Sequence, residues 1–276
     1  MKRKFFFFDI DETLAVGIPG HQYVPESALY ALRQLEANGH FIAIATGRSY
    51  MRAIDYMHSM GFHNMVSDGG YALVIDDELL YCHPLEHDAC IAFLEECIAK
   101  EMTWAVTTDM SGARYTPDMK FIEYSRPFPY MQGVLKEDLN IYEEDNIYKI
   151  YVACPVGMEQ TLETLKALPY GRFNDRYIYI QPDDKAGGIR AMVDHLGGDY
   201  QDVVVFGDHV NDISMFCDEW TNIAVGNAVD ALKEKATYVT KDAADDGIYY
   251  ACVHFGWIKD DFDNEKSSSA DEPHSD

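Results

Sequence analysis

The sequence is short of basic residues and of long apolar runs. It has 22 Lys and Arg residues against 47 Asp and Glu residues, which gives a formal net charge of −25. Because proteins that bind nucleic acids or anionic membranes carry basic surfaces, we expect neither kind of partner. No stretch approaches the roughly 20 apolar residues that a membrane-spanning helix needs.

The cysteines lack a pairing pattern. None stands in a Cys-x-x-Cys motif or at the spacing of metal ligands, and such isolated cysteines are typically small buried residues of a reducing compartment. The basic start of the chain and its four phenylalanines resemble a secretory signal, but Asp9 ends that apolar run too early. We therefore expect a cytoplasmic protein. The cysteines are Cys82, Cys90, Cys97, Cys154, Cys217 and Cys252.

Hydrophobic residues, by contrast, make up 47% of the 276 residues, enough for one large or two modest domains. The most informative apolar run is Phe5 to Phe8, which predicts a strand buried on both faces, typical of a parallel sheet between helices. Asp9 and Asp11 follow, at the strand end where such sheets bind ligands. Two carboxylates about 4 Å apart repel by about 4 kcal/mol at a partly dry site, so we expect Mg²⁺ there.

A second buried strand is predicted over 41–45, and it ends in Thr46, Gly47 and Arg48. A helix is predicted over 49–60, so the strand-helix-strand-helix order places Thr46 at the same sheet edge as Asp9. A hydroxyl and the next backbone N–H can bind a phosphate oxygen near a helix N-terminus. Thr46 is equally explained as a helix N-cap, and Arg48 as a residue of the helix surface.

Two later segments also aim polar groups at this edge. Lys185 opens a predicted helix, where a cation is unfavourable for the helix dipole, and this indicates a functional reason for the lysine. A buried strand over 203–206 is followed by Asp208, Asn211 and Asp212, and the spacing of the two acids directs both carboxylates toward the strand end.

The segment between Thr46 and Lys185 is far longer than the few dozen residues that a crossover between parallel strands needs, so we expect an inserted domain. Its pattern of helix, strand and strand occurs twice, which predicts an α+β module with an antiparallel sheet. Residues 118–145 allow no assignment. Helices are expected over 87–100 and 158–168, and strands over 104–107, 113–116, 147–153, 172–174 and 177–180.

Four segments together resemble the four motifs of the haloacid dehalogenase (HAD) superfamily of phosphohydrolases, and the insertion resembles the large cap of its Cof-type branch. Asp68 stands where many members of that branch carry Asn, and we assign it no role; His209 is either a neighbour of the site or an unengaged loop residue. The matching segments are Asp9-x-Asp11-x-Thr13, Thr46, Lys185 and Gly207-Asp208-x-x-Asn211-Asp212.

The resemblance implies an α/β fold with a Rossmann-like parallel sheet core, the HAD fold, and an inserted α+β cap domain. On this basis residues 1–82 and 182–258 form the core and residues 83–181 form the cap. The acidic, Ser-rich residues 259–276 have no apolar period and are expected to be a disordered tail.

The resemblance also implies a mechanism. Asp9 would be the nucleophile that forms an aspartyl-phosphate, and Asp11 would protonate the leaving alcohol and then activate water. Mg²⁺ would be bound by Asp9, by the backbone carbonyl of Asp11 and by Asp208, while Asp212 would act through water or orient Lys185. An acid at position 11 is typical of phosphatases and phosphomutases and is absent from dehalogenases.

Phosphate contacts are implied as well. Lys185 would offset charge on the phosphoryl group, and Asn211 would bind phosphate or Lys185. The expected substrate is a small phosphate ester, by default a sugar phosphate, with cap tyrosines such as Tyr115, Tyr124 and Tyr130 as packing residues or contacts. Alternatives are a hexose phosphomutase and a non-catalytic binding module, and the sequence gives no oligomeric state. The expected phosphate-binding residues are Ile10, Thr46, Gly47, Arg48, Lys185 and Asn211.

Overall fold

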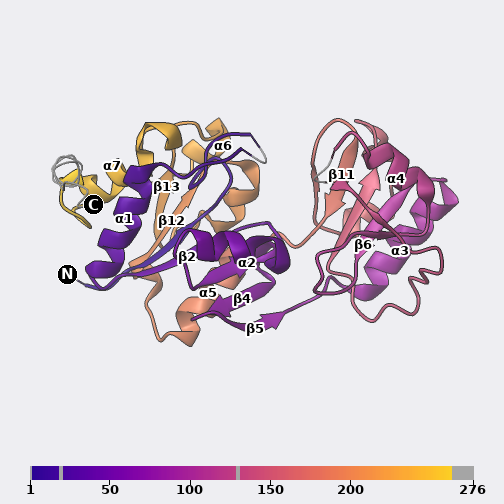
Figure 1. Cartoon of the computed structure of the whole chain (residues 1–276), viewed down its shortest axis with the longest axis horizontal. Helices are drawn as coiled ribbons and strands as arrows, with labels where there is room; N and C mark the ends of the chain where they lie inside the picture. The colour runs from indigo at the N-terminus through magenta and orange to yellow at the C-terminus, as the bar shows by residue number, and fades with distance from the viewer. Residues whose placement is uncertain (1, 19–20, 129–130, 263–276) are drawn as a thin grey trace, which may run out of the picture. The chain divides into compact units, whose positions relative to one another are not determined.

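The computed structural model describes residues 2–18, 21–128 and 131–262. The chain divides into two compact units, and each is described by itself (Figure 1). The first unit is formed by Met1–Ala45, Met60–Asn64 and Ile189–Asp276, and the second by Thr46–Ser59 and Met65–Gly188. The domain boundaries expected from the sequence stay a prediction. Most of the expected tail, and Tyr130, lie outside the described residues.

The first unit is built on parallel strands in the order β14-β13-β12-β1-β2. All four phenylalanines of β1 are buried, as expected for a central strand, and the rings of Phe8 and Phe206 stack with centroids 4.8 Å apart. These neighbouring strands run in the same direction, so their carboxyl ends meet at one edge. The strands are β1 (Phe5–Phe8), β2 (Phe41–Ala45), β12 (Val203–Gly207), β13 (Thr221–Ala224) and β14 (Tyr238–Val239).

Helices complete this unit. α1 (Glu26–Ala37) and α7 (Gly247–His254) pack side by side, and Tyr30 and Tyr249 meet edge to face with ring centroids 6.1 Å apart (Figure 1). No helix among the described residues is both long and apolar enough to span a membrane. Of α5 (Lys185–His195), the part from Ile189 onward belongs to this unit. The other helical segments are α6 (Asp230–Lys233), η5 (Tyr200–Asp202), η6 (Val210–Met215) and η7 (Ala243–Asp245).

The second unit contains α2 (Tyr50–Ser59), an antiparallel set of strands and a separate inserted sheet. β3 (Met65–Ser67) pairs with β4 (Ala72–Ile75), which pairs with β5 (Glu78–Cys82). The turn η1 (Asp68–Gly70) joins β3 to β4.

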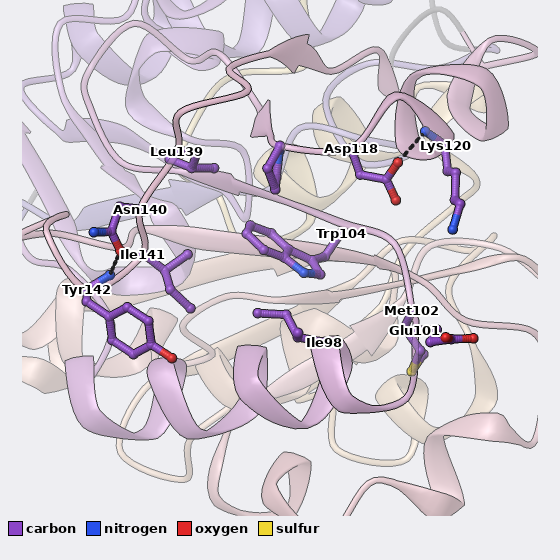
Figure 2. Close-up of a pocket in the computed structure, with 11 residues that line it drawn as sticks. Ile98, Glu101, Met102, Trp104, Asp118, Lys120, Leu139, Asn140, Ile141 and Tyr142 are labelled. Carbon is purple, nitrogen blue, oxygen red and sulfur yellow. Dashed lines mark hydrogen bonds between the residues drawn. The ribbon is translucent and has the colours of Figure 1, made fainter.

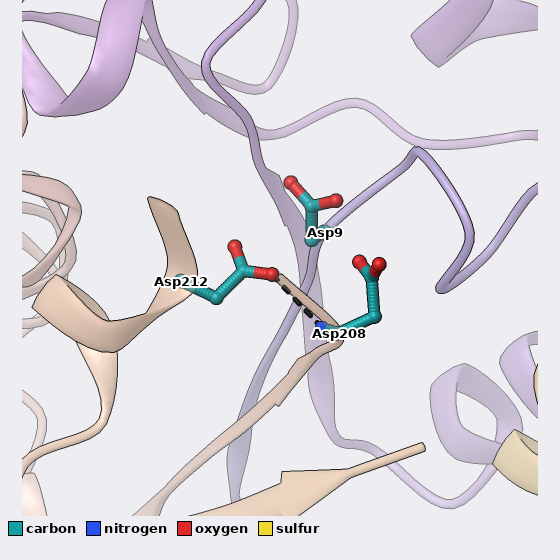
Figure 3. Close-up of side chains that lie close together, drawn as sticks. All are labelled: Asp9, Asp208 and Asp212. Atoms are coloured by element: carbon teal, nitrogen blue, oxygen red, sulfur yellow. Dashed lines mark hydrogen bonds between the residues drawn. The ribbon is translucent and has the colours of Figure 1, made fainter. Parts of the chain in front are cut away.

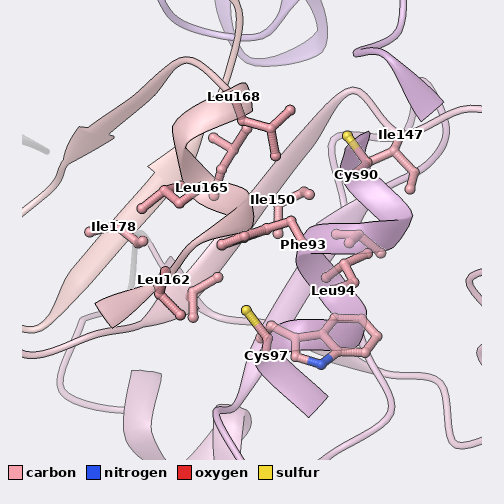
Figure 4. Close-up of a cluster of buried hydrophobic side chains, with 14 of the residues drawn as sticks. Cys90, Phe93, Leu94, Cys97, Ile147, Ile150, Leu162, Leu165, Leu168 and Ile178 are labelled. Atoms are coloured by element: carbon pink, nitrogen blue, oxygen red, sulfur yellow. The ribbon is translucent and has the colours of Figure 1, made fainter. Parts of the chain in front are cut away.

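The inserted sheet has six strands in the order β10-β11-β9-β6-β7-β8. The expected antiparallel sheet is mixed, because β7 and β8 pair in parallel while the other neighbours are antiparallel. α3 (His87–Ala99) packs its buried face on this sheet, and Figure 4 shows Phe93 and Cys97 of α3 among side chains of β9 and β11. The strands are β6 (Trp104–Thr107), β7 (Tyr115–Thr116), β8 (Val134–Leu135), β9 (Lys149–Ala153), β10 (Tyr170–Arg172) and β11 (Tyr177–Ile180).

The helix expected over 158–168 is wrong. Two 3-10 turns, η3 (Met158–Thr161) and η4 (Thr164–Ala167), stand there. The carboxylate of Glu96 on α3 accepts hydrogen bonds from the backbone N–H groups of Glu163 (3.0 Å) and Thr164 (2.9 Å). In a continuous helix these N–H groups would bond backbone carbonyls one turn earlier in the chain. Here they bond the distant Glu96 carboxylate, and the helix is interrupted. The unassigned stretch contains α4 (Met119–Ser125) and β8.

A pocket of about 390 Å³ lies in the inserted part of the second unit (Figure 2). Ile98 at the end of α3, Trp104 on β6 and Leu139 give it an apolar wall, and Asp118 and Lys120 lie at its rim. None of the site residues expected from the sequence lines this pocket, so it is not the candidate active site.

Candidate active site

Three aspartates meet in the first unit. Asp9 follows β1, Asp208 follows the neighbouring parallel strand β12, and Asp212 lies one turn later in η6. One carboxylate oxygen of each lies within 4.8 Å of the others, and Figure 3 shows the three side chains converging. All three are buried, with 4%, 6% and 0% of their surfaces exposed. The structure therefore brings together acids that are about 200 positions apart in the sequence.

Hydrogen bonds fix two of these carboxylates. Thr13 donates its hydroxyl to Asp208 Oδ1 at 3.0 Å. Asp212 Oδ2 accepts from the backbone N–H groups of Asp208 (2.9 Å) and His209 (3.0 Å), which holds it against the turn. A Cβ at Gly207 would lie 2.8 Å from Asp212 Cβ, so only glycine fits beneath this carboxylate. Thr13 was given no role from the sequence, although it completes the first motif.

The loop after β1 is also held in place. Glu12 has a left-handed backbone (φ 61°), and its carbonyl accepts a hydrogen bond from Asn227 Nδ2 at 2.8 Å. Asn227 in turn accepts from the N–H of Ala243. Asp11 is exposed and accepts from Gln22 Nε2 at 2.8 Å. Its carboxylate is not among the three grouped aspartates, which fits an acid that works outside the metal site.

The donor set fits Mg²⁺. Three buried carboxylates repel one another strongly when all are ionised, and a hard divalent cation with oxygen ligands offsets that repulsion. One oxygen of Asp212 accepts hydrogen bonds from two backbone N–H groups, and these bonds fix the orientation of the carboxylate within the group. Asn211 is half-buried in the same turn. The backbone carbonyl of Asp11 as a ligand stays a prediction.

Thr46, Gly47 and Arg48 lie in the second unit. Thr46 is buried, and its hydroxyl accepts from the N–H of Arg48 at 3.1 Å. Thr46 is therefore not the N-cap of α2, since α2 begins at Tyr50 and the Tyr50 N–H bonds Asp68 Oδ2 at 2.7 Å. The Arg48 guanidinium lies over the Tyr56 ring, 4.7 Å from its centroid.

Asp68 thus serves the start of α2. It is buried, and burial raises the pKa of its carboxyl, while the Tyr50 N–H, the nearby Lys149 and the Ser67 hydroxyl oppose that rise. Asp68, which stands where Asn was expected, therefore has a structural role at the start of α2. The sequence alone does not show this contact. Tyr115 donates its hydroxyl to Asp109, and Tyr124 packs against Tyr177, so both tyrosines have contacts within the second unit.

A glycine turn links Thr46 to Lys185 within the second unit. The Gly69 N–H donates to the Thr46 carbonyl (3.2 Å), and the Asp184 N–H donates to the Gly69 carbonyl (2.7 Å). Gly69 has φ 62°, and a Cβ there would lie 1.9 Å from the Pro182 carbonyl oxygen. Lys185 follows directly and is 1% exposed, so it is no solvated surface lysine. The sequence signal was the Asp-Gly-Gly turn, whose close approach to Pro182 it could not show.

The expected site residues therefore form two groups. Asp9, Ile10, Asp11, Asn211 and the aspartates at 208 and 212 belong to the first unit, and the remaining phosphate-binding residues belong to the second. Their assembly into one site stays a proposal. The second group is Thr46, Gly47, Arg48 and Lys185.

Comparison with known proteins defines the class. Residues 6–252 match the model of the haloacid dehalogenase-like hydrolase family. The chain belongs to this family, and the parallel core with an inserted α+β module is the fold expected from the sequence.

Particular relatives narrow the class. The chain is 29% identical over 267 residues to YkrA of Bacillus subtilis, whose name describes a candidate phosphatase, across 94% of this chain and 100% of YkrA. It is 23% identical over 262 residues to YcsE of the same organism, named as a 5-amino-6-(5-phospho-D-ribitylamino)uracil phosphatase, across 92% and 96%. The solved structure of the subclass IIB sugar phosphatase BT4131 superposes with a TM-score of 0.76 at 24% identity, across 92% of this chain and 100% of that one. The likeness to BT4131 shows the fold alone.

Proposed function

We propose that the protein is a Mg²⁺-dependent phosphatase that hydrolyses a small phosphorylated metabolite through an aspartyl-phosphate. The observation that supports this most directly is the buried group of Asp9, Asp208 and Asp212 at the ends of adjacent parallel strands. Membership of the hydrolase family and the phosphatase relatives agree with it.

In this proposal Asp9 attacks phosphorus, and the bond from phosphorus to the ester oxygen breaks as Asp11 donates a proton to that oxygen. Asp11 then takes a proton from water, which attacks the aspartyl-phosphate and releases phosphate and free Asp9. Covalent catalysis replaces one difficult displacement by two easier ones. The exposure of Asp11 suits this role, because the same carboxyl must exchange protons with an alcohol and with water.

Charge on the transferring phosphoryl group is offset by the surrounding groups. Lys185 contributes a buried ammonium, Thr46 a hydroxyl, and Asn211 an amide. Asp9, Asp208, Asp212 and the Asp11 carbonyl would hold Mg²⁺, and the bound ion would supply electrostatic stabilisation of the phosphoryl oxygens. The further phosphate contacts are the backbone amides of Ile10, Asp11 and Gly47 and the Arg48 side chain.

A sugar phosphate or similar metabolite is the proposed substrate, in a cytoplasmic setting. YcsE is named for a phosphorylated ribityl compound and BT4131 for sugar phosphates, and both names describe small phosphate monoesters. A hexose phosphomutase would share the aspartates but would need a bisphosphate activator. A non-catalytic module would bind Mg²⁺ without turnover.

The test is phosphate release from a panel of phosphorylated metabolites, with and without Mg²⁺, for the wild type and Asp9→Asn. We expect Mg²⁺-dependent release that Asp9→Asn loses by at least about 10³-fold while circular dichroism shows an unchanged fold. Asp218→Asn, an exposed acid outside the site, is the matched control and should keep full activity. Full activity of Asp9→Asn would refute the assignment.

A further inference from the structure

The inserted sheet presents two different faces. Along β9, Ile150 and Val152 belong to the apolar core beneath α3, so Lys149 and Tyr151 lie on the opposite face, since side chains alternate along a strand. Tyr179 of β11 pairs directly with Tyr151. The Lys149 ammonium lies over both rings, 5.7 Å from the Tyr151 centroid and 5.3 Å from the Tyr179 centroid.

Two arginines join this lysine. The Arg114 guanidinium, from the residue before β7, lies 4.6 Å from the Tyr151 centroid. Arg52 of α2 also lies near Arg114. Partial burial of the Arg52 guanidinium lowers its pKa, and repulsion from Arg114 lowers that pKa further. Burial alone would raise the pKa of the Tyr151 hydroxyl. The charges of Lys149, Arg114 and Arg52, together with a hydrogen bond between Arg114 and Tyr151, outweigh burial and lower this pKa. We call Arg52, Arg114 and Lys149 the cation cluster.

The described residues give the cation cluster no salt-bridge partner. Within residues 2–18, 21–128 and 131–262, no salt bridge involves any of its three members. Asp68 attracts Lys149, but that lysine donates its hydrogen bond to the Gly47 carbonyl (3.3 Å). Arg114 is 95% buried, and its Nε–H has no acceptor. In a chain of net charge −25, buried and unmatched positive charge costs stability unless an anion is bound.

The position of the cluster relates it to the phosphate-binding residues of its own unit. Lys149 bonds the carbonyl of Gly47, and Arg48 acts on Arg52 by charge. Burial raises the pKa of the Tyr179 hydroxyl, and the positive charge of Lys185 opposes that rise. A molecule held by Thr46, Arg48 and Lys185 through its phosphate would therefore have the rest of its body near the cluster.

We propose that the cation cluster binds a second oxyanion on the substrate, so that the preferred substrates are phosphate esters whose alcohol part carries a carboxylate or a further phosphate. This inference rests on the proposed phosphatase function. Arg114 and Arg52 offer planar guanidinium groups, which suit the oxygens of either anion. Arg52 is exposed, Lys149 is half-buried and Arg114 is buried, so Arg52 is the member most accessible from solvent.

Matched pairs of esters test this. 3-Phosphoglycerate and glycerol 3-phosphate differ in a carboxylate, and fructose 1,6-bisphosphate and fructose 6-phosphate differ in a phosphate. We expect kcat/KM to favour the more anionic member of at least one pair by about tenfold or more. Preference in the first pair alone identifies a carboxylate site, and preference in the second alone identifies a phosphate site. Equal rates within both pairs would overturn the proposal and leave the phosphatase function intact.

Variants separate the cluster from general charge. Arg52→Gln and Arg114→Gln should reduce the preference about tenfold, while Lys120→Met, an exposed cation of the same unit, should keep it. Arg52→Gln is the decisive variant, because Arg52 is exposed and its loss leaves the core unchanged, whereas the buried Arg114→Gln can fail to fold. A preference that survives Arg52→Gln in full refutes the cluster.

Binding to Asp9→Asn protein, measured by calorimetry with 3-phosphoglycerate and glycerol 3-phosphate, gives a readout without turnover. If no ester is hydrolysed by the wild type, the phosphatase proposal fails, but tighter binding of 3-phosphoglycerate that Arg52→Gln removes still supports the cluster. The two fructose phosphates are compared in the same way, and equal binding within both pairs contradicts the cluster.

Discussion

The grouped aspartates of the first unit and the cation cluster of the second are opposite in charge and also in origin. Asp9, Asp208 and Asp212 follow strands or sit one turn beyond them, inside short motifs. The cations come from a helix, a loop and a strand face, with no motif around them. The proposed catalytic residues thus lie in short motifs at strand ends, whereas the residues proposed to bind the body of the substrate come from separate parts of the second unit.

The largest expected effect comes from breaking the aspartate side. Asp208→Asn removes a negative charge from the buried group while keeping the shape and the acceptor for Thr13. We expect kcat/KM to fall by about 10²- to 10³-fold and the Mg²⁺ concentration for half-maximal rate to rise, since an amide is a weaker ligand than a carboxylate. Steady-state hydrolysis over a Mg²⁺ titration measures both.

The exposed acid Asp218 again supplies the control, as Asp218→Asn should leave both quantities unchanged. An Asp208→Asn protein with normal Mg²⁺ dependence would show that the buried acids serve the fold rather than a cation. In that case the grouped aspartates could not be contrasted with the cation cluster as a catalytic site with a binding site.

Sequence patterns predicted several strands of both sheets well because their signals are local. The strand expected over 41–45 stands there, as do those over 104–107 and 177–180. The acids at strand ends follow from the order of strands and helices, and the structure brings Asp9, Asp208 and Asp212 together as that order requires. The fold class expected from the motifs is confirmed.

What the sequence could not give depends on distant contacts. The helix expected over 158–168 is divided by Glu96, more than sixty positions earlier. The parallel pairing of β7 with β8 follows a connection that contains α4, in a stretch for which the sequence allowed no assignment. Arg52, Arg114 and Lys149 come from three separate segments, and Lys149 is available to the other two because alternate residues of β9 lie away from α3. No short window contains any of these facts.

The next effect in size concerns the backbone that links Thr46 to Lys185 in the second unit. Gly69→Ala places a Cβ 1.9 Å from the Pro182 carbonyl oxygen at a left-handed φ of 62°, so the turn must shift. We expect a loss of about 3 kcal/mol or more in the free energy of unfolding, measured by urea denaturation, together with a loss of activity.

Gly39→Ala is the matched control. Gly39 has φ 81°, but a Cβ there would meet no atom within 4 Å, so only backbone strain of about 1 kcal/mol is expected. Equal losses in the two variants would show that backbone strain alone matters, and the close approach of this turn to Pro182 would then have no bearing on the site.

The smallest expected effect concerns Glu96, an acid of the second unit whose charge is stabilised by hydrogen bonds. Burial opposes ionisation of Glu96, but hydrogen bonds from Thr164, Glu163 and Lys100 outweigh burial and hold its pKa at about 2, below the usual 4.5. Because the pKa of Glu96 is lower in the folded protein than in the unfolded chain, its ionised form stabilises the fold above about pH 4.5. This stabilisation is lost as the pH falls toward 2. We expect Glu96→Gln to cost about 1–3 kcal/mol at pH 7 and progressively less below pH 4.5, measured by urea denaturation at each pH. A cost independent of pH would mean that the shape of the side chain, rather than its charge, divides the segment after residue 158.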